Sequence, residues 1–102
     1  MIYELKIDKE GFKGFAKVEI PKFSERMAIL KETNFKDGQN IDQVDQVVKM
    51  VDLAKEKTKE LEVKHVGGVE FKSVDSLVDY NGTLPIVYEI AGIILNGVPL
   101  GN

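Results

Sequence analysis

Apolar and charged residues alternate strictly near the start of the chain, over residues 3–8 and again over residues 16–20. This period-two pattern predicts two strands, each with one buried face. Lys9-Glu10-Gly11 supplies a turn between them, and Pro21 ends the second strand. We therefore expect an antiparallel β-hairpin over residues 2–20. Because two strands alone are only marginally stable in water, the apolar face of the hairpin must pack on helices.

The spacing of apolar residues changes to three and four after the hairpin. Phe23, Met27 and Leu30 recur at this helical period, and Ser24 can cap the helix that they predict. The pattern fades near Thr33. A short helix is therefore expected directly after the hairpin.

The next helix is the longest that the sequence predicts. Asp37-Gly38 is a turn signal, and Asn40 with Gln43 resembles a capping box. The predicted helix ends near Glu62, and Leu53 lies on its charged side. Its apolar stripe consists of Ile41, Val44, Val47, Val48, Val51 and Ala54.

The last third of the chain predicts two more helices. Gly67-Gly68 marks a break, residues 69–71 form a short extended piece, and Ser73 can cap a short helix. Thr83 is the candidate cap of the last helix, Leu84–Leu95. Asn96-Gly97 supplies a left-handed stop after that helix.

Together these segments predict an α+β fold that is predominantly helical. We expect one domain over residues 1–102, with a β-hairpin in residues 1–20 packed on about four helices. The helical part runs over residues 23–102 and ends in a short C-terminal tail. No internal repeat or long linker divides the chain.

Composition narrows the function without naming it. The chain has 43% hydrophobic and 30% charged residues, which is ordinary for a globular protein, and its net charge of −3 disfavours nucleic acid as a partner. It has no cysteine, which excludes disulfides and thiolate chemistry. No segment has the length of a membrane span or the pattern of a secretory signal, so we expect a cytoplasmic protein without a membrane partner.

Candidate chemistry is sparse. His65 is the only histidine, and no partner set supports a catalytic or metal-binding role for it. The pairs Asp75/Asp79 and Asp42/Asp45 face away from the apolar stripes, which indicates solvated or helix-capping carboxylates. No phosphate loop, nucleophile elbow or calcium loop is present. We therefore expect no enzyme activity, no cofactor and no metal.

The last helix is the most informative segment. On a helical wheel its apolar residues cover roughly 200°, about twice the arc that a surface helix needs for its core contact. One interpretation is that this helix is central and fully covered by the rest of the domain. The other is that part of the arc binds another chain, with Leu53 as a weaker, separate candidate. The candidate interface residues are Leu84, Tyr88, Ala91, Leu95 and Leu53.

Two stretches resemble the tail assembly chaperones of long-tailed bacteriophages. One is residues 18–26, a strand that runs through Pro21 into a Ser-Glu-Arg helix start. The other is residues 73–102, an Asp-rich short helix, a very apolar helix, and the ending Asn-Gly-Val-Pro-Leu-Gly-Asn. The resemblance implies a helical α+β protein that self-associates and shields the apolar helices of the tape measure protein in the host cytoplasm. Some members of the family also have a longer form made by ribosomal frameshifting, and the short tail here resembles the unextended product.

Two other classes of function remain open at this stage. A small structural or connector protein of a phage particle would form a stable symmetric ring. A regulatory or inhibitor module would bind one host protein. A small hydrolase is a more distant alternative.

Overall fold

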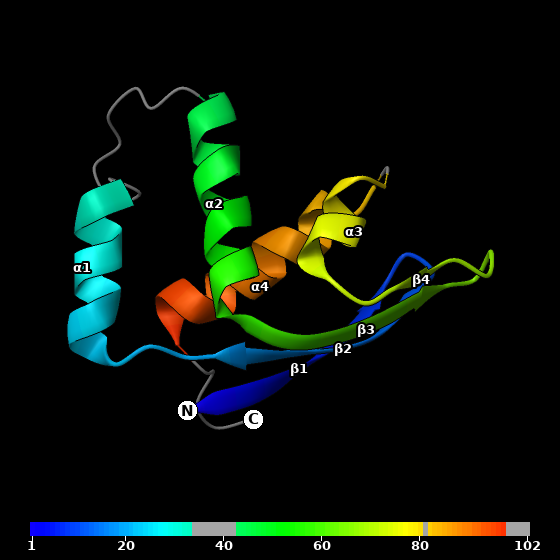
Figure 1. Ribbon diagram of the computed structural model, residues 1–102, viewed down its shortest axis with the longest axis horizontal. Coiled ribbons are helices and arrows are strands. Elements are labelled where there is room, and N and C mark those ends of the chain that lie inside the picture. The colour runs from blue at the N-terminus through cyan, green and yellow to red at the C-terminus, as the bar shows by residue number, and fades with distance from the viewer. Residues whose placement is uncertain (34–42, 81, 98–102) are drawn as a thin grey trace.

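The computed structural model describes residues 1–33, 43–80 and 82–97 of the chain. The predicted turn and cap over residues 37–40, and the C-terminal tail, lie outside these residues. The described part contains four helices and a four-stranded antiparallel sheet in the order β1-β2-β3-β4. Figure 1 shows the helices on one side of this sheet.

The structure contains the predicted hairpin. Strand β1 (Ile2–Lys9) pairs with β2 (Phe12–Glu19) along its whole length, with Leu5 opposite Ala16. Glu10 and Gly11 form the turn with positive φ angles of 48° and 89°. A glycine suits the second of these positions because it adopts positive φ without a steric penalty.

The prediction of a predominantly helical fold is wrong, because the sheet contains two further strands. Helix α2 (Gln43–Lys57) does not continue to Glu62; it leads directly into strand β3 (Thr58–His65), which pairs with β2. Leu61 and Val63 of β3 are buried and alternate with exposed charged residues. This alternation is the period-two pattern of a half-buried strand, and a helix would place Leu61 and Val63 on opposite sides.

The remaining strand is short. Strand β4 (Glu70–Phe71) pairs with β3 after a turn at residues 66–69. It lies within the short extended piece that the sequence predicted over residues 69–71. In this turn the Val66 N–H donates to the Gly11 carbonyl at 3.0 Å. The β3–β4 turn is thereby tied to the β1–β2 turn at the same end of the sheet.

Gly14 lies inside β2 where the next strand approaches closely. A Cβ atom at this position would collide with the Glu62 carbonyl oxygen. No side chain fits there without moving the backbone of β3. Gly14 therefore serves the packing of β2 against β3.

One face of the sheet and the helices form the core. Helix α4 (Leu84–Asn96) lies at its centre and contacts strands β1 and β2 as well as α1 (Phe23–Thr33), α2 and α3 (Val74–Val78). Ser73 caps α3 through a capping box, as predicted. The fully buried members of this core include Ile7, Val18, Val63, Leu77, Ile86, Val87, Ile90 and Ile94.

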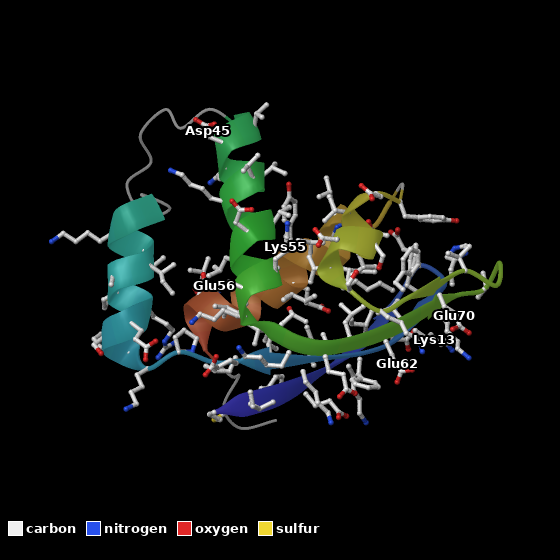
Figure 2. The ribbon with its side chains drawn as sticks, viewed as in Figure 1. Lys13, Asp45, Lys55, Glu56, Glu62 and Glu70 are labelled. Atoms are coloured by element: carbon white, nitrogen blue, oxygen red, sulfur yellow. The ribbon has the colours of Figure 1, made fainter. Side chains whose placement is uncertain are left out.

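No described helix covers the other face of the sheet, which is charged. Figure 2 shows Lys13, Glu62 and Glu70 along the sheet, away from helix α2. Several acidic and basic side chains pair on or beside this face, including Lys64 with Glu70 at 3.4 Å and Lys72 with Glu62 at 3.8 Å. Alternating signs of charge leave this face without a strong field of either sign.

Candidate protein-binding surface

Helix α4 has a buried side and an exposed side. Its buried residues span about 140° of the helical wheel, while Leu84, Tyr88 and Leu95 fall within about 40° of one another outside that arc. Leu84 and Tyr88 are 38% and 36% exposed, and Leu95 is half-buried. Part of the apolar arc that the sequence displays is therefore uncovered among the described residues. The buried residues are Ile86, Val87, Ile90, Ala91 and Ile94.

Two of the predicted interface residues do not lie on this surface. Ala91 is 0% exposed and Leu53 is 6% exposed, so both belong to the core. Leu53 is buried because the side of α2 that packs on α4 is not the side that carries the predicted valine stripe. Val44 and Val48 of that stripe are exposed instead. The candidate surface keeps Leu84, Tyr88 and Leu95.

Gly92 lies beside these residues, one helical turn after Tyr88. A Cβ atom added to Gly92 would meet no heavy atom within 4 Å. Glycine inside a helix costs about 0.5–1 kcal/mol relative to alanine, and no contact of the described residues requires its small size. We call Leu84, Tyr88, Gly92 and Leu95 the α4 stripe. Gly92 leaves a shallow gap in the stripe, where another backbone can approach closely.

The loop before α4 fixes where the stripe begins. Thr83 is buried, and its hydroxyl donates to the carbonyls of Leu77 and Tyr80 rather than capping the helix. Pro85 occupies the first turn, where its missing N–H has no helical partner in any case. At the other end, Gly97 ends the helix with a φ of 82°. The Thr83 hydrogen bonds join the start of α4 to the end of α3.

An ion pair marks one border of the exposed side. Glu89 lies about 60° beyond Gly92 on the helical wheel. Its carboxylate is 3.2 Å from the Lys9 ammonium at the end of β1. Both side chains are partly exposed, so this pair contributes little to stability. The pair shows that the Glu89 side of α4 faces the end of β1.

A second group of exposed apolar side chains was not predicted as a surface. Phe23 on α1 is 67% exposed and Val48 on α2 is 50% exposed, although the helical spacing suggested that both face the core. Helix α1 packs mainly on α4, and α2 packs on α4 and α3. The apolar stripes of α1 and α2 are thus only partly used within the described residues, a result that periodicity alone cannot reveal.

His65 has a structural role that the sequence did not indicate. Its Nδ1 accepts a hydrogen bond from the Gly67 N–H at 3.1 Å, and its ring lies 4.5 Å from the Phe12 ring, centre to centre. Phe71 and Tyr80 complete this aromatic cluster. The histidine therefore holds the β3–β4 turn against the hairpin.

Asp75 and Asp79, which the sequence paired, lie in different surroundings, and Asp42 of the other pair lies outside the described residues. Asp75 is exposed and lies 2.9 Å from the Lys55 ammonium, where it joins α3 to α2. Through this hydrogen bond and its charge, Asp75 raises the pKa of Lys55 above its usual value. Asp79 lines a hollow beside His65 and Tyr80. Within the described residues, no group of three or more histidine, aspartate or glutamate side chains is placed to hold a metal ion.

Comparisons with known proteins do not identify the chain. No family model, curated protein or solved structure matches it. Among the described residues, no helix is both long and apolar enough to cross a membrane.

Proposed function

We propose that this protein is a non-enzymatic tail assembly chaperone of a long-tailed bacteriophage, and that it binds an apolar helix of the tape measure protein on the α4 stripe. The observation that carries the binding role is the uncovered apolar side of α4. Leu84 and Tyr88 are each more than one-third exposed there, beside the gap at Gly92. The phage assignment depends on the resemblance of residues 18–26 and 73–102.

The chemistry of the stripe suits a helical partner. Leucine and tyrosine side chains at positions four and seven apart form a ridge along one side of a helix. A second amphipathic helix can bury its own apolar side against this ridge, and the gap at Gly92 lets the two axes approach. Apolar burial provides the driving force, because no strong charge lies within the stripe.

The first test of the phage assignment is genetic. A tail assembly chaperone gene is expected next to a very long reading frame for a helical tape measure protein. A genome without such a neighbour contradicts the phage assignment. The stripe can be tested separately as a protein-binding surface.

The biochemical test uses co-purification of the full chain with that tape measure protein. Tyr88→Glu and Leu84→Glu are expected to abolish the complex, because each places a charge in the buried centre of the contact. Val66→Glu is the matched control, since Val66 is 79% exposed and lies in the β3–β4 turn, outside the α4 stripe. Circular dichroism should show that all three variants stay folded. A complex that survives both stripe variants contradicts the proposed surface.

A further inference from the structure

The outer edge of β1 is the longest unpaired edge of the sheet. All eight residues of β1 pair with β2 on one side, and no other described strand pairs with β1 on its outer side. The opposite edge of the sheet is formed by β4, which has only two residues, and by residues 58–62 of β3, which pair with β2 but not with β4. Natural sheets commonly protect an edge by shortening its strand, by adding a bulge or proline, or by placing charged side chains along it. Strand β1 is not short and has neither a proline nor a residue with positive φ. Its charged residues Glu4, Lys6 and Asp8 alternate in sign, so they can pair with charges on another strand instead of repelling it.

We propose that β1 pairs antiparallel with β1 of a second copy of this chain, around a two-fold axis at Leu5. In this arrangement Glu4 of each copy lies opposite Lys6 of the other, on the charged face of the sheet. Leu5 lies opposite its own copy on the helix-covered face, and Tyr3 lies opposite Ile7. The contact is isologous, as in most protein dimers. It uses β1 rather than the α4 stripe, so it is independent of the proposed function.

The charges along β1 select this register. An axis at Glu4 would place Glu4 opposite its own copy, and an axis at Lys6 would do the same with lysine. Like charges directly opposite each other in a sheet are unfavourable, whereas opposite charges attract. An axis between two residues is excluded, because it would place residues of opposite faces directly across from each other, whereas directly opposite residues in an antiparallel pair point to the same face.

The length of the overlap supports the same register. An axis at Ile7 also places opposite charges together, Lys6 with Asp8, but it pairs only Leu5 through Lys9. The axis at Leu5 pairs Ile2 through Asp8 and so uses nearly the whole strand. The product is a continuous eight-stranded antiparallel sheet, with the helices of both copies on one face. Each of its two outer edges is then formed by the short β4 strand and residues 58–62 of β3.

The test is the concentration dependence of mass in analytical ultracentrifugation of the full chain. The wild type is expected to change from monomer to dimer as its concentration rises. Glu4→Lys and Lys6→Glu should each raise the dimer dissociation constant at least tenfold, because each creates two like-charge contacts across the axis. The double variant with both changes exchanges the two charges and so restores both pairs of opposite charge. Its dissociation constant should lie within about threefold of the wild-type value.

A matched control separates the edge from the sheet interior. Lys17 of β2 lies opposite Glu4 of β1 on one side and opposite Glu60 of β3 on the other. Glu60→Lys therefore makes the same charge change beside the same lysine, but away from the β1 edge. It should leave the dissociation constant unchanged, and circular dichroism should show every variant folded.

Three results would overturn the proposal. The first is a wild-type chain that stays monomeric up to about 100 µM, because weak but specific dimers form at roughly that concentration. The second is an equal effect of Glu60→Lys and Glu4→Lys. The third is a double variant no better than its single parents. None of these results affects the test of the α4 stripe, so the two proposals fail separately.

Discussion

The two sides of helix α4 show how one apolar segment can serve two purposes. On one side, Ile86, Ile90 and Ile94 are at most 1% exposed and form the centre of the core. On the other side, Leu84 and Tyr88 keep more than one-third of their surface in contact with solvent. The same residue types therefore have different energetic roles within thirteen residues. Their positions around the helix, rather than their hydrophobicity, decide which of them hold the fold together.

The largest expected difference is between buried and exposed side chains of α4. Ile90→Ala should lower the free energy of unfolding by about 2–5 kcal/mol, because it leaves a cavity in a packed core. Tyr88→Ala should lower the free energy of unfolding by less than about 1 kcal/mol, because the Tyr88 side chain is more than one-third exposed and packs against the protein on one side only. Urea denaturation of both variants measures the difference. Equal losses would show that Tyr88 is as important to the core as Ile90.

Gly14 of β2 and Gly92 of α4 differ in the space around them, which predicts opposite effects of an alanine substitution. Gly14→Ala should destabilise the fold by at least about 1–3 kcal/mol, because the added methyl group meets the Glu62 backbone. Thermal unfolding followed by circular dichroism measures this loss. An unchanged melting temperature would mean that β2 and β3 can separate at this position without cost.

Gly92→Ala is expected to have the opposite sign. The added methyl group has open space, and alanine favours the helix over glycine, so stability should rise by about 0.5–1 kcal/mol. If the gap at Gly92 receives a partner helix, the same change should weaken partner binding. A variant that is more stable and binds equally well would remove Gly92 from the proposed surface.

The smallest effect concerns an exposed ion pair of the sheet. Lys59 lies 3.3 Å from Glu19, and its hydrogen bond and charge lower the pKa of Glu19 below the usual value. Because the pKa is lower in the folded chain, the pair stabilises the fold above the unfolded-state pKa and is lost as pH falls through the folded-state pKa. NMR titration of the Glu19 carboxyl should show a low midpoint. Lys59→Met should return that midpoint to the usual range.

The sequence predicted the elements whose signals are local. The hairpin follows from strict alternation and a glycine turn, and α3 follows from Ser73 at its N-terminus. Strand β3 was missed because its residues continue a helix of mixed charge, and its pairing with β2 is a long-range contact. Propensity alone does not contain such contacts, which decide between helix and strand.

The candidate surface was predicted in part, for a related reason. The wheel identified the apolar excess of α4 and placed Leu84, Tyr88 and Leu95 together. It could not show that Ala91 is fully buried, or that Leu53 turns toward the core. The positions of neighbouring helices set the border between core and surface, and a single sequence does not record them. The role of His65 was missed because it depends on Phe12, far away in the sequence.

Helix α2 and strand β3 join directly, so the side that α2 turns to the core and the face on which the β3 side chains lie are fixed relative to each other. Lys57 ends the helix and Thr58 begins the strand, so no loop absorbs a change in chain length. One inserted residue would rotate the preceding helix by about 100° relative to the strand, or else turn Leu61 and Val63 to the opposite face. Two inserted residues would restore the strand faces and leave the helix misaligned. The length of the chain at this point is therefore as constrained as the identity of its core residues.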